Sequence, residues 1–113
     1  MTIKDSNVTI MVKEMDKSIL FYQSIGFIIK QRWDNHYAQL TVPGITIGLH
    51  PTNEISTGSG NISIGFTTDN FEETKSLLSN LSIYAVAREE EGGQFLHFHD
   101  PDGTMLYFIK PKW

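Results

Sequence analysis

Two stretches of similar pattern decide the fold: residues 7–25 are NVTIMVKEMDKSILFYQSI, and residues 61–78 are NISIGFTTDNFEETKSLL. Each begins with Asn and continues with alternating polar and apolar residues, which is typical of a strand with one face in a core. Each then passes into a segment with apolar residues at helical spacing. The repetition indicates that one structural unit occurs twice in the chain.

The alternation predicts which face of each strand is buried. The side chains that we expect in the core are Val8, Ile10 and Val12 in the first strand, and Ile62, Ile64 and Phe66 in the second. Residues of the other parity, including Asn7, Thr9, Asn61 and Ser63, then form a neutral polar patch. This patch has two interpretations: it hydrogen-bonds a ligand, or its members satisfy one another and ordered water.

A helix follows each of these strands. We expect helices over residues 17–22 and 71–81, because Asp16 and Asn70 are good N-cap residues. Asn70 and Glu73 also form an approximate capping box, and Gly26 is a plausible stop for the first helix. The predicted apolar faces are Met15, Ile19, Tyr22 and Ile25 in the first helix, and Phe71, Thr74, Leu77, Leu78 and Leu81 in the second.

Three strands are predicted after each helix. They cover residues 27–33, 37–42 and 45–50, and then 83–88, 94–99 and 105–110, separated by short segments rich in Gly, Pro, Asp and Asn. The chain of 113 residues fits one domain. We expect an α+β fold of two βαβββ modules, with one helix on the outer face of each. Module one covers about 1–51, a flexible joint about 52–60, and module two about 61–113.

Composition excludes several classes of function. The chain has no cysteine, so it has no disulfide, no thiolate nucleophile and no cysteine-ligated metal. Its net charge of −4, with nine Lys plus Arg, argues against a nucleic-acid partner. No apolar run approaches the roughly 20 residues that span a bilayer, and the first residues lack the apolar core of a signal peptide. We therefore expect a cytoplasmic protein with no membrane partner.

The order of elements, with FY at residues 21–22 and DPDG at 100–103, resembles the vicinal oxygen chelate superfamily. This group includes glyoxalase I, extradiol dioxygenases, fosfomycin-resistance transferases and bleomycin-binding proteins. The resemblance extends from Asn7 to about Ile109, and is strongest in VKEMDKSILFYQSIGF (12–27) and HFHDPDGTMLYF (97–108). It implies two modules facing each other across a mixed, eight-stranded, partly closed sheet around a cleft, and a homodimer.

The resemblance also implies where the family's metal enzymes would place their ligands. The two ligand positions of the first module fall on Asn7 and Gly48, and those of the second on Asn61 and Tyr107. Asn is a poor ligand for a divalent transition metal, Gly has no side chain, and a neutral Tyr is a weak ligand. We therefore expect no metal site and no cofactor, and glyoxalase, dioxygenase and metal-dependent transferase activities are in doubt.

Other side chains on the predicted cleft faces could still bind or react. The residues that we expect to bind a ligand are Trp33, Tyr37, Gln39, His50, His97 and Tyr107. Aromatic walls with a few polar tips are typical of small-molecule pockets. The alternative for Trp33 and Tyr37 is a place in the core or in a dimer interface. For His50, His97 and His99 the alternatives are a relocated metal site or the plain lining of a polar cavity.

The hypothesis that these residues favour is a metal-free small-molecule binding protein whose ligand is unknown. The main alternative is a lyase- or dioxygenase-type enzyme, using a relocated site of His50, His97 and His99 or metal-free acid–base chemistry. A third possibility is an interaction module that uses the fold for dimer formation only. The run of Glu89, Glu90 and Glu91 either steers a cationic ligand or is a solvated loop. His36, beside a predicted turn, is expected to be exposed.

Overall fold

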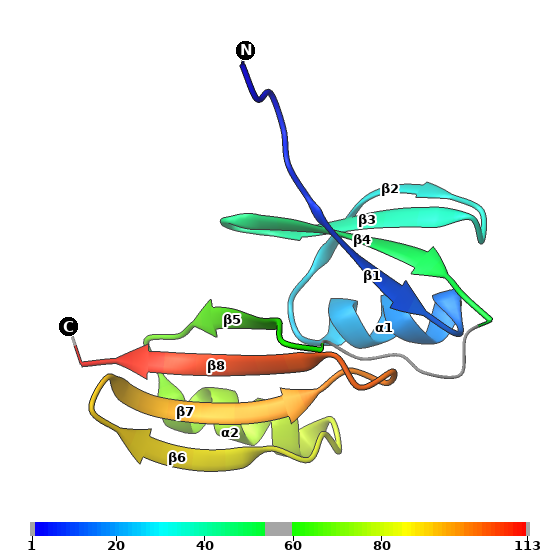
Figure 1. Ribbon diagram of the computed structural model, residues 1–113. Helices are drawn as coiled ribbons and strands as arrows, with labels where there is room; N and C mark the ends of the chain where they lie inside the picture. The colour runs from blue at the N-terminus through cyan, green and yellow to red at the C-terminus, as the bar shows by residue number, and fades with distance from the viewer. Residues whose placement is uncertain (1, 54–59, 113) are drawn as a thin grey trace. The chain divides into compact units, whose positions relative to one another are not determined.

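The computed structural model describes residues 2–53 and 60–112, and the chain divides into two compact units, Met1–Thr57 and Gly58–Trp113 (Figure 1). The first unit contains β1 (Val8–Val12), α1 (Met15–Ser24), β2 (Ile28–Trp33), β3 (Tyr37–Val42) and β4 (Ile45–Pro51). The second contains β5 (Ser63–Thr67), α2 (Phe71–Asn80), β6 (Val86–Glu90), β7 (Gly93–His99) and β8 (Met105–Pro111). This order confirms the α+β class and the two βαβββ modules. Most of the predicted joint, residues 54–59, lies outside the described residues.

Each unit has its own mixed sheet. The strand orders are β1-β4-β3-β2 and β5-β8-β7-β6, with the first strand of each module parallel to the last and the other neighbours antiparallel. In the part of the chain that the structure describes, strands pair only within their own unit, so the eight strands form two open four-stranded sheets. The predicted arrangement of both modules around one cleft stays a prediction.

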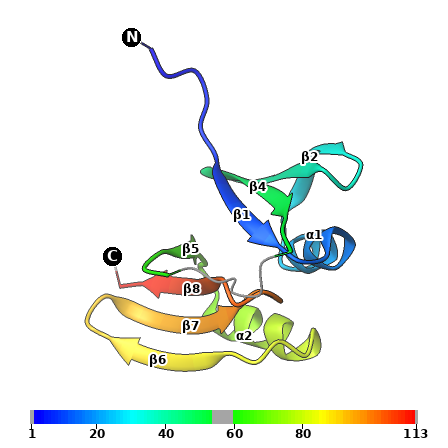
Figure 2. The same cartoon turned by 45° about the vertical axis from the view of Figure 1, so that its right-hand side comes forward.

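In the first unit, α1 covers one face of the sheet (Figure 2). The side chains buried between them are Ile10, Val12, Met15, Ile19, Tyr22, Ile25, Ala38, Leu40, Ile47 and Leu49. All four residues of the predicted apolar face of this helix are therefore in the core. Val8 was also predicted in the core, and this prediction is wrong. It is 41% exposed, and the buried residues of β1 are Ile10 and Val12.

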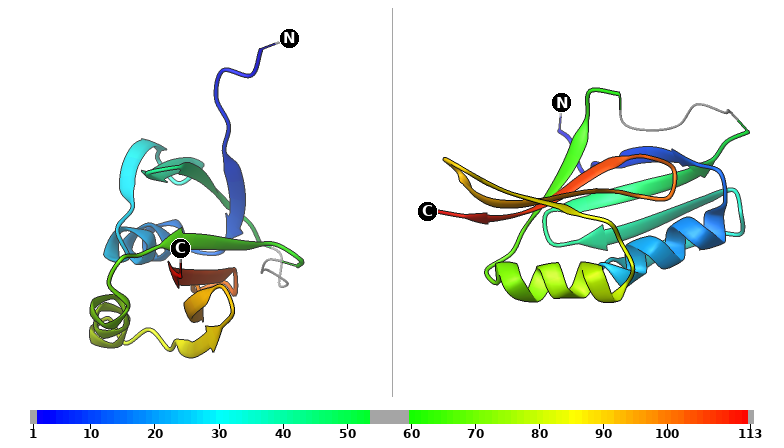
Figure 3. Two further views of the ribbon diagram at one scale, coloured as in Figure 1. Left: turned by 90° about the vertical axis from the view of Figure 1, so that its left-hand side faces the viewer. Right: turned by 90° about the horizontal axis from the view of Figure 1, so that it is seen from below.

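In the second unit, α2 lies along one face of its sheet (Figure 3). The core contains Ile64, Phe71, Leu78, Leu96, Phe98 and Leu106. Three predicted core positions are wrong. Ile62 precedes β5 and is 58% exposed, while Leu77 and Leu81 are exposed because they lie at the border of the buried stripe of Phe71, Thr74 and Leu78. Neither helix in the described residues has the length and apolar character that crossing a membrane requires.

The predicted N-cap is correct for α2 and wrong for α1. The amide N–H of Glu73 donates to Asn70 Oδ1 at 3.0 Å, and Asn70 Nδ2 donates to Glu73 Oε2 at 3.2 Å. The first helix instead begins two residues earlier than predicted, after Glu14, whose side chain makes no capping bond. Asp16 lies inside the first turn and accepts from Arg32 at 2.7 Å, which ties α1 to β2.

Both helices end in the same hydrogen-bond motif, with a residue at positive φ. In α1 this residue is Gly26, and the next amide, of Phe27, donates back to Tyr22 O at 2.9 Å. In α2 it is Ser82, at φ 58°, and the amide of Ile83 donates to Leu78 O. In each helix the amide of the positive-φ residue donates as well, Gly26 to Gln23 O at 3.1 Å and Ser82 to Ser79 O at 3.0 Å, and the two bonds at each terminus together form the Schellman motif. Because Ile83 completes the helix terminus, β6 begins at residue 86 and not at 83 as predicted.

The predicted turn at DPDG is present between β7 and β8. The amide of Gly103 donates to Asp100 O at 3.1 Å, and Gly103 has a φ of 91°. Asp100 is only 5% exposed, and its Oδ1 accepts from the amides of Asp102 and Thr104 at 2.9 and 2.8 Å. This carboxylate therefore fixes the turn from which β8 begins.

Candidate functional site

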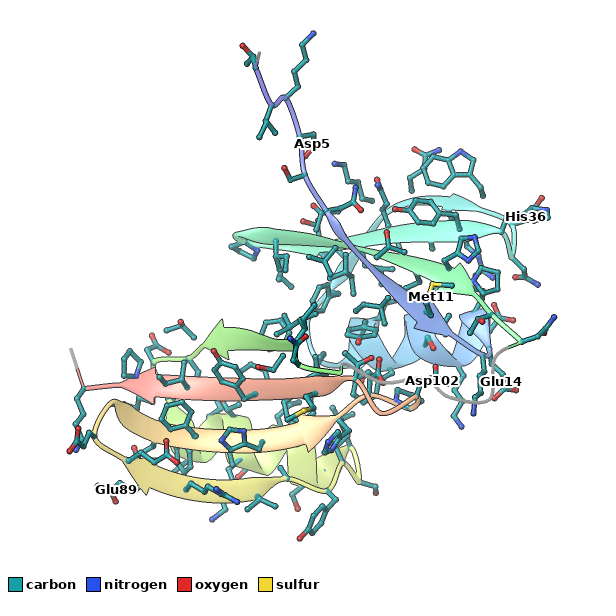
Figure 4. All side chains as sticks on the ribbon, in the orientation of Figure 1. Asp5, Met11, Glu14, His36, Glu89 and Asp102 are labelled. Atoms are coloured by element: carbon teal, nitrogen blue, oxygen red, sulfur yellow. The ribbon has the colours of Figure 1, made fainter. Side chains whose placement is uncertain are left out.

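The face of the first sheet that α1 does not cover is called here the first open face. It carries Thr9, Met11, Trp33, Tyr37, Gln39, Gly48 and His50. Register partners on neighbouring strands point to the same side of a sheet. The pairs Trp33 with Tyr37, Gln39 with Gly48, and Gly48 with Thr9 therefore place polar and aromatic groups from all four strands on one surface. Met11, labelled in Figure 4, marks β1 on this face.

Tyr37 lies over the backbone of Gly48. A Cβ atom at Gly48 would collide with the phenol oxygen and ring carbons of Tyr37, so the missing side chain makes room for the ring. The Tyr37 hydroxyl donates to Asn7 Oδ1 at 3.5 Å, and Thr9 Oγ1 donates to the same oxygen at 3.3 Å. The phenol thus fills the space between Asn7 and Gly48.

Trp33, Tyr37 and Gln39 lie together on the first open face. The rings of Trp33 and Tyr37 are stacked, with centroids 5.5 Å apart and planes at 30°. Gln39 Nε2 donates to the Tyr37 hydroxyl oxygen at 3.4 Å. Trp33 is the register partner of Tyr37, and a register shift between Ile29 and Gln31 puts Ile29, which has the same parity as Trp33, beside Leu40 on the other side of the sheet. Sequence parity alone does not reveal that shift.

His50 is on the same face but apart from this group. It is the register partner of Met11, it is exposed, and its Nδ1 lies 2.9 Å from the carbonyl oxygen of Pro51. No described contact joins His50 to Trp33 or Tyr37. His36 lies in the turn between β2 and β3 and is exposed, as predicted.

A groove of about 480 Å³ adjoins the first open face at Asn7. It is lined by residues 5–8 and by the end of the β3–β4 hairpin, including Thr41 and Thr46, whose hydroxyls lie 3.2 Å apart. This volume is within the usual range of ligand pockets. Asp5, labelled in Figure 4, is one of the lining residues, and the amide of Ser6 and the ammonium of Lys30 lower the pKa of its carboxyl.

The side of the second sheet that α2 does not cover, called here the second open face, holds an aromatic cluster. His97 and Tyr107 are register partners on β7 and β8, with ring centroids 5.9 Å apart. Phe95 stacks on His97 at 5.7 Å and 9°, and is 6.0 Å from Tyr107. Leu96 and Phe98 are buried on the other side, which confirms the predicted orientation of His97.

Tyr107 repeats the relationship seen in the first unit. A Cβ atom at Gly65, its register partner on β5, would collide with the Tyr107 phenol. His99 is exposed near the end of β7. Glu89 and Glu90 are exposed on the edge strand β6, and Glu91 follows in the turn (Figure 4).

The residues at the positions implied for metal ligands do not fit a metal. Gly48 has no side-chain donor atom, and the Asn7 side-chain carbonyl oxygen already accepts from two hydroxyls. Within residues 2–53 and 60–112, no three His, Cys, Asp or Glu side chains gather closely enough to hold an ion. The relocated set of His50, His97 and His99 draws on both units, so it stays a prediction.

Two features of the faces were missed in the sequence. Phe95 has the same parity as His97 and lies two residues before it, so strict alternation could have placed it on the second open face. Gly48 and Gly65 leave room for the phenol rings of Tyr37 and Tyr107. A single sequence gives no signal of this role, because it depends on which strands are neighbours.

Comparison with known proteins agrees with this architecture. No curated protein sequence matches the chain. A bleomycin resistance determinant encoded on the transposon Tn5 superposes with a TM-score of 0.75 at 19% identity, covering 98% of this chain and 100% of that one. A bleomycin-binding protein crystallised with bleomycin has a TM-score of 0.69 at 19% identity, covering 97% and 100%.

A further solved structure represents another activity on the same fold. The fosfomycin resistance protein FosX from Listeria monocytogenes, in complex with Mn(II) and sulfate, has a TM-score of 0.81 at 17% identity, covering 99% of this chain and 93% of that one. A family model matches residues 6–108, nearly the whole chain. The chain belongs to the Glyoxalase/Bleomycin resistance protein/Dioxygenase superfamily.

Proposed function

We propose that this protein binds small organic molecules on the open faces of its sheets, without a metal ion. The observation that carries the proposal is the position of Tyr37, whose phenol fills the space between Asn7 and Gly48, where the family resemblance places metal ligands. A phenol hydroxyl at this place can donate to, or accept from, a ligand oxygen. The bleomycin-binding relative with the same fold supports small-molecule binding as the class of function.

The predicted ligand-binding residues divide between the units. Trp33, Tyr37, Gln39 and His50 serve the first open face, and His97 and Tyr107 the second. Both faces combine aromatic rings with a few polar tips, the composition typical of small-molecule sites. We further propose that the protein is cytoplasmic and a homodimer, as the resemblance implies. Light scattering on the purified protein tests the dimer, and a monomeric mass across micromolar concentrations would contradict it.

The proposal is tested by protein-observed NMR of the isotope-labelled chain with a library of small ring compounds, recorded with a chelator present. We expect some compounds to shift amide signals of the open faces, and the shifts to persist at the same compound concentrations in chelator. The function is wrong if no compound binds, or if binding appears only after a divalent metal is added. Tyr37→Ala, which removes the phenol from the exposed side of the sheet, should weaken binding to the first face while the spectrum stays dispersed.

A further inference from the structure

We infer that Met11 and His50, on the first open face, form a binding site for a soft monovalent metal ion, copper(I). Neither residue is at one of the four positions that the family resemblance implies for metal ligands. Small-molecule binding does not require this ion, so the site is tested separately from the proposed function. Three observations carry it: the register of the two residues, the hydrogen bond of the His50 ring, and the chemistry of the surrounding face.

The strand register places the two side chains together. Met11 of β1 and His50 of β4 are direct partners on two parallel, hydrogen-bonded strands. Neighbouring strands lie about 5 Å apart, and both side chains point to the side of the sheet that α1 does not cover. Met11 is 45% exposed and His50 is exposed, so neither is held in the core. The Met side chain has three rotatable bonds, so its sulfur can reach an ion bound to the neighbouring imidazole.

The hydrogen bond of His50 leaves one ring nitrogen available. Nδ1 lies 2.9 Å from the carbonyl oxygen of Pro51. Because a carbonyl oxygen only accepts, Nδ1 carries the proton of the neutral ring, and Nε2 keeps its lone pair. Metal-binding histidines typically donate their other ring N–H in this way, which fixes the tautomer and the orientation of the ring. Within the described residues, no hydrogen bond occupies Nε2.

The two donor groups decide the class of ion. A thioether is a soft, uncharged ligand that selects copper(I), and imidazole also suits copper. Mg²⁺ and Mn²⁺ prefer carboxylate, carbonyl and water oxygens, and Zn²⁺ sites use Cys, His, Asp and Glu. The first open face as defined contains no Asp or Glu that could ligate a divalent ion, and no Lys or Arg that would repel a cation. Lys13 has the parity of Met11 but lies beyond Val12, the last paired residue of β1.

The test follows the methyl signals of the methionines by ¹³C NMR during titration with Ag⁺, a redox-stable analogue of copper(I). A second His–Met pair of register partners, His99 with Met105, is removed by Met105→Leu. In this background we expect Ag⁺ to shift the Met11 methyl and the His50 ring signals with one apparent dissociation constant. Met15 is only 5% exposed and is the internal reference, whose methyl signal should not shift.

Two variants test the ligands one at a time. Met11→Leu removes the sulfur but keeps an apolar side chain of similar size, and His50→Gln removes the imidazole. Each should raise the dissociation constant for Ag⁺ at the other residue about tenfold or more, the order of magnitude typical of partners lost from a metal site. His36→Gln removes an exposed imidazole from the β2–β3 turn and is the matched control, which should leave the Met11 shift unchanged. All three substituted residues are exposed, so the amide spectra should stay dispersed.

Copper(I) itself is then supplied with ascorbate under nitrogen, and its affinity is measured by competition with bicinchoninate. The variants should rank as they do with Ag⁺, and Zn²⁺ at the same concentrations should leave the Met11 methyl signal in place. A Met11 signal that does not respond to Ag⁺, or a Met11→Leu protein that binds as tightly as its parent, would overturn the site. An equal shift with Zn²⁺ would overturn the assignment to a soft ion.

The metal site and the proposed function fail in different ways. If library compounds bind the chelated protein but Ag⁺ does not shift the Met11 methyl signal, the metal site is wrong and the proposed function stands. If Ag⁺ binds with the expected order of variants but no library compound binds, the proposed function is wrong and the metal site stands.

Discussion

The Tyr37 ring lies over the backbone of Gly48, in the place that a side chain at Gly48 would need. Gly48 is on β4 and Tyr37 on β3, two strands that pair antiparallel. The phenol hydroxyl, the atom nearest to the Gly48 position, makes a long hydrogen bond of 3.5 Å to Asn7. One glycine thus determines where the aromatic group of the first open face sits.

Gly48→Ala should displace Tyr37. The backbone at Gly48 does not have positive φ, so Ala fits the strand and the clash is with the ring alone. We expect a loss of about 1 kcal/mol in the free energy of unfolding, measured by urea denaturation, together with shifted Tyr37 ring signals in NMR. In a Tyr37→Ala background the same substitution should cost nothing, because the ring is gone. An equal loss in the free energy of unfolding in both backgrounds would contradict the view that Gly48 makes room for the Tyr37 ring.

Ser82→Gly should stabilise the protein. Ser82 has a φ of 58° at the end of α2, a conformation that is unfavourable for residues with a Cβ. We expect a gain of about 0.5–1 kcal/mol in the free energy of unfolding, after allowing for the greater freedom of Gly in the unfolded chain. Gly26→Ala, at the equivalent position of α1 with a φ of 120°, is the matched control and should destabilise. The changes in the free energy of unfolding of the two variants should have opposite signs, and changes of the same sign would contradict this prediction.

Asp100→Ala should destabilise the second unit. The carboxylate is buried and accepts two amide N–H groups of its own turn. Removing it leaves those amides without their acceptor, at a cost of roughly 1–3 kcal/mol. Asp100→Asn keeps the accepting oxygen and should therefore lose clearly less stability than Asp100→Ala. Thermal unfolding of the three proteins ranks them, and an Asn variant as unstable as the Ala variant would show that the charge, and not the accepting oxygen, is what matters.

The local pattern of the sequence predicted the elements because their signals are local. Strand alternation located β1 and β5, and the Asn70–Glu73 pair located the start of α2. The predicted start of α1 was wrong. Asp16 is a good N-cap residue by type, but it lies inside the first turn and accepts a hydrogen bond from Arg32 of β2. A tertiary contact overrode the local preference.

The candidate site was predictable only in part. Parity placed Tyr37, Gln39 and His97 on uncovered faces, since side chains alternate along a strand. The stacking of Trp33 on Tyr37, by contrast, depends on how β2 pairs with β3, and the room for a phenol ring at Gly48 and Gly65 depends on strand order. These are relationships between strands, which a single sequence does not encode locally.

Acid should weaken the contact between Asp5 and Lys30. The Ser6 amide and the Lys30 ammonium lower the pKa of Asp5 in the folded protein below its ordinary value of 3.8. The stabilisation is therefore present above that ordinary value and is lost as the pH falls through the lowered pKa. Lys30→Gln should raise the pKa of Asp5 part of the way back, because the Ser6 amide remains. Carboxyl ¹³C NMR titration measures this.

The matched control for that titration is Lys17→Gln. Lys17 lies 4.0 Å from Glu14 in the same unit, so its loss removes an equal charge without touching Asp5. The pKa of Asp5 should be nearly unchanged in this variant. Equal rises in both variants would assign the shift to net charge and not to the contact with Lys30.

Metal-independent binding is the central claim, and one experiment tests it most directly. The tag-free protein is analysed for metal by plasma mass spectrometry after incubation with Zn, Ni, Mn and Fe(II), and binding of a ring compound selected in the library screen is measured on the same samples with and without chelator. We predict no stoichiometric metal and an unchanged dissociation constant in chelator. Near-stoichiometric metal that is lost in His50→Ala or His97→Ala, with binding that requires it, would contradict the account and favour a metalloenzyme.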